Sequence, residues 1–202
     1  LFEKKEIGIV ICDTIFFNNS GKQKQLYKKT KPPEGNVFKD LLDNYFISLE
    51  TVVVRSEALK GMKELFDIRF DAIEEYDVFI RLCYRWELAY VDQILAKWRV
   101  HNNSVTWTRS NLFGSERRLF LEKINALIPQ FHSQYLSEYR NILRKCDYED
   151  AKEYWQSNNS QLARKILAPH RFSGIKWLLI YLLTFFPFPF FRLIEKIGRV
   201  RP

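Results

Sequence analysis

The first hundred residues alternate between short apolar runs and polar segments, the pattern of a sheet with helices packed on it. Residues 7–12 (IGIVIC) are apolar and rich in β-branched side chains, and they predict a buried strand. The polar turn at 18–21 follows a further apolar stretch and predicts a strand pair. Another strand is predicted over 51–54, and one or two more over 88–100.

Helices are predicted between these strands. Residues 37–42 look helical, and Ser56 is expected to cap a helix that ends near Gly61. From Glu75 onward, apolar side chains recur at i, i+3, i+4 and i+7, which predicts an amphipathic helix. The positions that follow this spacing are Tyr76, Phe79, Ile80 and Cys83.

The pattern becomes helical beyond residue 110. Residues 115–167 carry helical periodicity throughout, and Asp147 and Ser160 are expected to be N-caps of two later helices. One buried stripe is expected to contain Leu121, Ile124 and Ile128.

Three segments follow from these patterns. We predict an α/β unit over residues 1–110, a helical extension over residues 111–170 and a tail over residues 171–202.

The tail contains the most apolar segment of the chain. Residues 177–191 are fifteen positions interrupted by Pro187 and Pro189, whereas a spanning helix needs about 20 apolar residues. We expect this segment to lie in the plane of a membrane interface. The alternative is a helix packed on its own domain or on a partner subunit.

The charge of the chain is unevenly distributed. The net charge is +4 over residues 1–31, −3 over 32–150 and +7 over 151–202, which sums to the total of +8. A basic, apolar tail beside a slightly acidic centre favours an anionic membrane surface over nucleic acid. The chain has three cysteines without CxxC spacing, a pattern that predicts neither disulfides nor a zinc site.

Two groups of polar residues are candidates for chemistry. Glu74 and Glu75 stand at the start of a predicted helix with Asp77 close behind, although acids at this position also complement the helix dipole. A predicted strand delivers Arg99 and His101 to a polar loop. Arg81 is expected to pair with Asp77 at i,i+4 spacing.

Four pieces of the sequence resemble, in order, the second half of family 2 glycosyltransferases of the glycosyltransferase A fold. The pieces are IGIVICDTIFFNNSGK, GNVFKDLLDNYFISLETVVVR, FDIRFDAIEEYDVFIRL and WRVHNNS, and together they cover roughly residues 1–110. The resemblance implies a partial, Rossmann-like glycosyltransferase A domain followed by a helical C-terminal extension. It also implies that the N-terminal nucleotide-binding unit of the family is missing, and no Asp-x-Asp metal motif occurs in the chain.

The resemblance implies a role for each candidate residue. Glu75 corresponds to the catalytic base, where the family more often has Asp, and Glu74 and Asp77 would complete an acidic cluster. Arg99 and His101 would contact the donor diphosphate. His101 would also approach a divalent metal, Mn²⁺ or Mg²⁺.

The expected activity is transfer of a sugar from a nucleotide-sugar donor to a glycan or lipid-linked acceptor, with inversion. The resemblance implies a hexosyltransferase-like enzyme of bacterial surface-polysaccharide synthesis on the cytoplasmic face of the cell membrane. The chain alone is expected to be inactive. One alternative is a non-catalytic, membrane-associated adaptor of the same fold. The other is a nucleic-acid-binding module that uses the lysines of residues 22–31, which the acidic centre disfavours.

Overall fold

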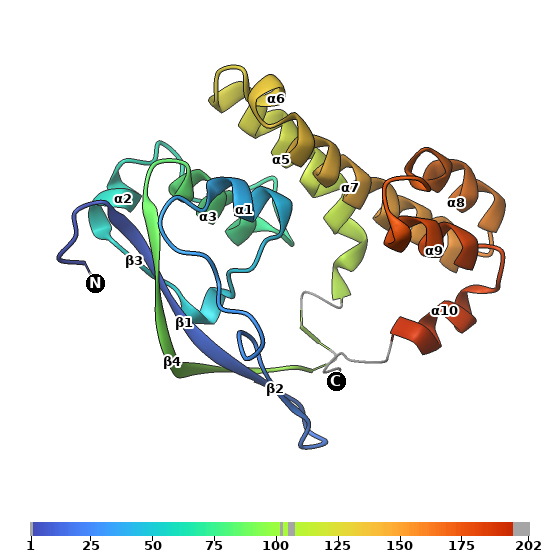
Figure 1. Cartoon of the computed structure of the whole chain (residues 1–202), viewed down its shortest axis with the longest axis horizontal. Coiled ribbons are helices and arrows are strands. Elements are labelled where there is room, and N and C mark those ends of the chain that lie inside the picture. Colours follow the sequence, from blue (N-terminus) through green and yellow to red (C-terminus); the bar gives the residue numbers. More distant parts are fainter. Residues whose placement is uncertain (1, 102, 105–107, 196–202) are drawn as a thin grey trace.

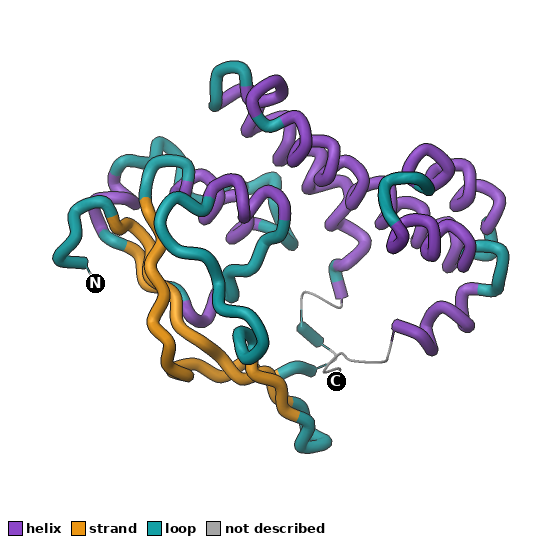
Figure 2. The backbone as a smooth tube through the Cα atoms, viewed as in Figure 1, coloured by secondary structure: helices purple, strands orange, loops and turns teal. Residues whose placement is uncertain are grey.

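The computed structural model describes residues 2–101, 103–104 and 108–195. The fold is mixed α/β, with the strands gathered at one end of the molecule and helices occupying the rest (Figures 1 and 2). The helices α5 and α7 extend from the α/β end to a second group of helices, α8 to α10 (Figure 1). The α/β class is thus confirmed at this coarse level.

The strand β1 (Ile7–Phe17) lies at the centre of a mixed four-stranded sheet. It pairs in parallel with β4 (Glu87–Arg99) along its whole length. On its other edge it pairs antiparallel with β3 (Val53–Val54) near its start and with β2 (Gln23–Gln25) near its end. The predicted strand pair at 18–21 is therefore the β1–β2 hairpin, and the region 88–100 forms one strand.

The helices and helical turns described between residues 38 and 134 belong to the α/β end and to the start of the extension. They are α1 (Phe38–Asp43), the turn η1 (Leu49–Thr51), α2 (Ser56–Lys60), α3 (Glu74–Cys83), the turn η2 (Ser110–Leu112), α5 (Phe113–Leu127) and α6 (Phe131–Gln134). The remaining helices are α7 (Leu136–Gln156), α8 (Ser160–Leu167), the turn η3 (Ala168–His170), α9 (Ile175–Leu183) and α10 (Phe188–Glu195).

One hydrophobic core joins the sheet to the first part of the helical extension. Ile9 and Ile11 of β1 belong to the same buried cluster as Phe120 of α5, Phe131 of α6 and Ile142 of α7. The predicted stripe of Leu121, Ile124 and Ile128 is buried in this cluster, as expected. The change to helical structure therefore occurs near residue 110, while the core continues across it.

A second, smaller core holds α8 and α10 against the last turns of α7. Trp155 of α7 and Ala163 and Leu167 of α8 pack with Phe188 and Phe191 of α10. The break between the two clusters falls within α7, between Cys146 of the first and Ala151 of the second.

Four local predictions differ from the structure. Residues 49–51 form a helical turn, so the strand predicted over 51–54 shrinks to β3. Ser56 and Ser160 are the first residues of α2 and α8 and cap neither helix, because the N-cap positions belong to Arg55 and Asn159. Asp147 lies inside α7, where its carboxylate binds Arg118 of α5 at 2.9 Å and His170 at 2.7 Å. Long-range ion pairing has replaced local capping there.

Candidate functional site

The site begins at the N-terminus of α3, where a side chain from a distant helix holds the preceding loop. The N-cap residue Ile73 supplies no side-chain hydrogen bond. Glu116 of α5 instead holds the residues that lead into the helix, because its buried carboxylate accepts hydrogen bonds from the backbone N–H groups of Asp71 (3.0 Å), Ala72 (3.1 Å) and Ile73 (3.0 Å). A carboxylate at this end of a helix satisfies free N–H groups and complements the helix dipole. Glu116 thereby fixes the backbone that presents Glu74 and Glu75.

Glu75 has a raised pKa and no cationic partner. Its side chain is partly buried, and burial is the main cause that raises its pKa, assisted by the negative charges of Glu74 and Glu116. Its own backbone N–H opposes this effect. Among the described residues no Lys, Arg or His forms an ion pair with Glu75. The result is a carboxylate whose affinity for protons exceeds that of an ordinary Glu.

Two buried polar atoms close to Glu75 lack hydrogen-bond partners within the described residues. They are Oε2 of Glu74 and the hydroxyl of Tyr45. Tyr45 has a pKa well above the usual value, first because of burial and second because of the negative charge of Glu75. Buried polar atoms are normally hydrogen-bonded, so these two atoms are exceptions in the interior of the protein.

Tyr45 also lines a cavity of about 440 Å³ between the β1–β2 side of the sheet and the loop after α1. Tyr27, Phe46, Lys31 and Pro33 contribute further to its wall. Aromatic faces and scattered polar groups are typical of small-molecule sites. The cavity adjoins the acidic cluster through Tyr45.

Asp13 holds one wall of this cavity in place. Its buried carboxylate accepts hydrogen bonds from the side chain of Gln25 (2.7 Å) and from the backbone N–H of Tyr27 (3.1 Å). The hydroxyl of Tyr27 in turn donates to the carbonyl of Phe46 at 2.7 Å. These bonds link the strand β1 to the two loops that surround the cavity.

Asp77 belongs to a different cluster from Glu75. It is completely buried, and its carboxylate binds Arg81 at 2.6 Å and Lys123 of α5 at 3.0 Å. Lys123 also binds Asp67 at 2.9 Å. The predicted i,i+4 pair of Asp77 and Arg81 is confirmed. The structure therefore does not bring Asp77 together with Glu75. Asp77 is instead surrounded by cationic partners, as expected for an acid that stabilises the fold.

Arg99 and His101 lie at the far end of β4. Arg99 is the last residue of the strand, pairs in register with Phe17 and is exposed, while His101 is half-buried. In Figure 1 the end of β4 lies at the bottom of the view, away from α3. No hydrogen bond or ion pair connects either side chain to the acidic cluster within the part of the chain that the structure describes. Their role at a diphosphate stays a prediction.

The described residues contain no group of three or more His, Cys, Asp or Glu side chains arranged to hold a metal ion. The metal contact of His101 therefore has no ligand partners in the described residues and also stays a prediction.

Sequence patterns missed several residues that build the site. Glu116 and Tyr45 lie in segments with no motif, and their contributions depend on contacts with residues far away in sequence. Asp13 offered a weak signal, since it directly follows the buried strand at 7–12.

No protein-family model, curated protein or solved structure matches this chain. What the site can do chemically therefore rests on its own residues.

Proposed function

We propose that this chain carries the acceptor side of a family 2 glycosyltransferase, with a glycosyltransferase A-type fold and Glu75 as the catalytic base. The observation that supports the proposal most is the raised pKa of a partly buried Glu75 that lacks a cationic partner. A general base requires a carboxylate that is free to accept a proton and basic enough to do so near neutral pH. The resemblance to this family, carried by four sequence pieces, points to the same residue.

In the proposed reaction Glu75 removes the proton from an acceptor hydroxyl. The hydroxyl oxygen attacks the anomeric carbon of the donor sugar, the bond from that carbon to the diphosphate breaks, and the nucleoside diphosphate leaves. The proton ends on Glu75. A single displacement of this kind inverts the anomeric centre. Arg99 and His101 would contact the diphosphate, and a divalent metal, when bound, would neutralise its charge.

The cavity beside Tyr45 is the proposed acceptor site. Asn44 and Ser48 of its lining offer hydrogen-bonding groups to sugar hydroxyls, and Tyr27 and Phe46 offer aromatic faces. A glycan or a lipid-linked sugar is the acceptor class that this chemistry suits. By resemblance, the enzyme would act at the cytoplasmic face of a bacterial membrane in surface-polysaccharide synthesis.

The test is the stereochemistry of transfer, measured with the longest form of the protein that its coding sequence specifies. Common UDP- and GDP-sugars are supplied with Mn²⁺ and simple glycan acceptors, and the product is examined by proton NMR. We expect an anomeric configuration opposite to that of the donor. Retention of configuration, or no transfer with any donor, contradicts the proposal.

A further inference from the structure

The helix α9 has two apolar faces, and one of them packs on the protein. Trp177 stacks edge-on against Tyr148 of α7 at 6.2 Å between ring centroids, and Ile180 and Tyr181 pack against the second core. Thr184, just after the helix, is completely buried, and its carbonyl accepts a hydrogen bond from Arg164 of α8 at 2.9 Å. These positions follow i, i+3, i+4 and i+7 spacing, so they form one side of the helix.

The opposite face is apolar and exposed. Ile175, Leu179 and Leu182 follow i, i+4 and i+7 spacing on α9, and Phe186 lies in the turn after the helix. Their exposed fractions are 72%, 52%, 46% and 52%. We call these four residues the apolar stripe. Phe172, Phe185 and Phe190 extend the exposed apolar surface beside it. Part of the tail thus packs on its own domain, as the alternative interpretation held, but about half or more of each stripe side chain stays exposed.

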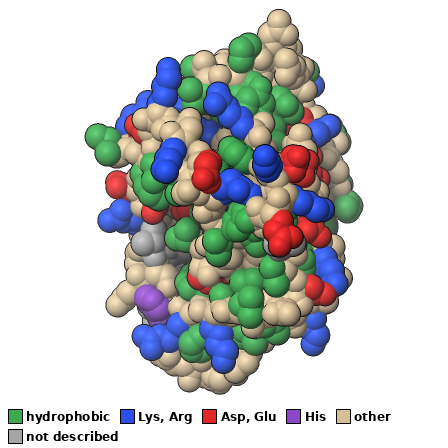
Figure 3. Space-filling view, turned by 90° about the vertical axis from the view of Figure 1, so that its left-hand side faces the viewer, with side chains coloured by type: hydrophobic (Ala, Val, Ile, Leu, Met, Phe, Trp, Pro, Cys, Tyr) green, Lys and Arg blue, Asp and Glu red, His purple; other side chains and the backbone are tan. Residues whose placement is uncertain are grey.

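The charged residues of the segment that carries the stripe are all basic. Residues 154–194 contain five Lys and Arg and no Asp or Glu. The face that carries the N-terminus and α2 differs, because basic and acidic side chains are intermingled there (Figure 3). A surface that joins apolar and basic side chains without acids complements an anionic, partly apolar partner.

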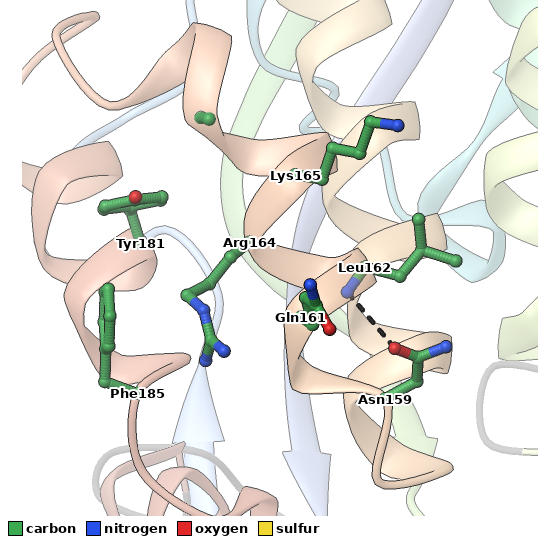
Figure 4. A pocket seen from close by; sticks show the side chains of 8 residues that line it. Asn159, Gln161, Leu162, Arg164, Lys165, Tyr181 and Phe185 are labelled. Carbon is green, nitrogen blue, oxygen red and sulfur yellow. Dashed lines mark hydrogen bonds between the residues drawn. The ribbon is translucent and has the colours of Figure 1, made fainter.

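A groove of about 650 Å³ between α8 and α9 joins the two kinds of side chain. Figure 4 shows Arg164 and Lys165 of α8 in this groove, with Tyr181 and Phe185 on its other wall. The guanidinium of Arg164 lies 4.7 Å from the centre of the Phe185 ring. A cation is therefore held directly beside an exposed aromatic ring at the edge of the apolar surface.

Charge and helix length distinguish between the possible occupants of this surface. A second copy of the chain would place one basic tail against another, which like-charge repulsion opposes. No helix among the described residues is long and apolar enough to cross a bilayer. Lipid contact along the side of α9 requires no crossing.

We propose that the apolar stripe docks this chain on the surface of an anionic bilayer, with α9 parallel to the membrane plane. The stripe and Phe185 enter the boundary between headgroups and acyl chains, and Arg164, Lys165, Arg171 and Lys176 face lipid phosphates. Because the other side of α9 is fixed to α7 and α8, docking also orients the helical extension. Lys196, Arg199 and Arg201, predicted to flank the segment, lie outside the described residues. This proposal does not depend on sugar transfer.

The test is flotation of the full chain with vesicles of phosphatidylcholine, with and without phosphatidylglycerol. We expect binding to the anionic vesicles that weakens at high salt. The double variant Leu179→Ser with Leu182→Ser removes half of the stripe and should lower the partition coefficient at least about tenfold. The matched control is Leu95→Ser with Leu127→Ser, which changes two comparably exposed leucines outside the tail and should bind like the wild type.

Three results would overturn the proposal. The first is absence of wild-type binding to anionic vesicles. The second is equal binding of the stripe variant and the wild type. The third is that light scattering shows a dimer of the wild type and a monomer of the stripe variant. The stripe would then join two copies of the chain. Circular dichroism of each variant establishes that the fold is retained.

Discussion

Glu75 and Asp77 lie two positions apart on α3, yet their surroundings are opposite. Asp77 is completely buried and binds two cationic side chains. Glu75 is partly buried beside two further carboxylates and pairs with no cation in the described structure. Nearly opposite faces of one short helix thus hold a neutralised charge and an uncompensated one.

The difference teaches how to separate structural from functional acids. A buried carboxylate that binds cations stabilises the fold once the pair has formed, and removing one partner is costly. A desolvated carboxylate without a cation opposes folding when it is charged, and sites of chemistry are where such groups concentrate. Sequence alone offers Glu74, Glu75 and Asp77 as one acidic cluster, and the structure divides them.

The largest expected effect is on catalysis by the uncompensated acid. Glu75→Gln keeps the size of the side chain but removes its basicity, so turnover should fall at least about 100-fold with donor binding little changed. Initial rates in the longest form of the protein measure this. Glu74→Gln is the matched control and should lose less. The reverse ranking would show that Glu74 is the base.

The paired acid should instead affect stability. Asp77→Ala leaves Arg81 and Lys123 buried without this partner, and the free energy of unfolding should fall by about 3 kcal/mol. Urea denaturation measures the change. Asp71→Ala is the control, because this exposed carboxylate forms a long ion pair of 3.6 Å with the exposed Arg109. Its removal should change the free energy of unfolding by less than about 0.5 kcal/mol. If both variants lower the free energy of unfolding equally, Asp77 is not the stabilising acid that its cationic partners indicate.

The sequence predicted those parts of this site that depend on short spacing. The strand at 7–12 follows from a continuous apolar run, and the helix that begins at the acidic pair and the pairing of Asp77 with Arg81 follow from spacings of three and four residues. Lys123 and Glu116 decide which acid is neutralised and which is not, and both come from α5, more than forty residues away. Periodicity places a residue on a face of its own helix and carries no information about which distant side chain it meets.

The same limit explains the errors in capping. Asp147 has the side chain of a good N-cap, but contacts with Arg118 and His170 place it inside the long helix α7. For the tail, hydrophobicity indicated that some surface must cover residues 177–191. Only the three-dimensional arrangement shows that one side of α9 is covered by protein.

A smaller effect is expected at the far end of β4, and it tests how far the functional region extends from Glu75. His101→Ala should weaken metal-dependent donor binding about tenfold, because a hydrogen bond to a charged group contributes roughly 1.5–3 kcal/mol. Calorimetry of the longest form of the protein, with and without Mn²⁺, measures it. His132→Ala, an exposed histidine on α6, is the control. If His101→Ala leaves donor affinity and the metal requirement unchanged, His101 is a loop residue without this role.

The smallest expected effect is a difference in sign between two pH dependences of stability. The pKa of Glu75 is raised in the folded state by burial, so its favourable contribution is complete below the unfolded pKa and is lost as pH rises through the folded value. The pKa of Asp67, in the paired cluster, is lowered chiefly by hydrogen bonds from Arg69, so its contribution is present above the unfolded pKa and is lost as pH falls. Glu75→Gln should therefore be more stable than the wild type at neutral pH, and Asp67→Asn less stable.

Both differences should shrink as pH falls toward and below about 4, the region of unperturbed carboxyl pKa values. Urea denaturation at a series of pH values measures both curves. If Glu75→Gln destabilises the protein at neutral pH, Glu75 is a stabilising acid like Asp77, and the contrast between the two faces of α3 is lost.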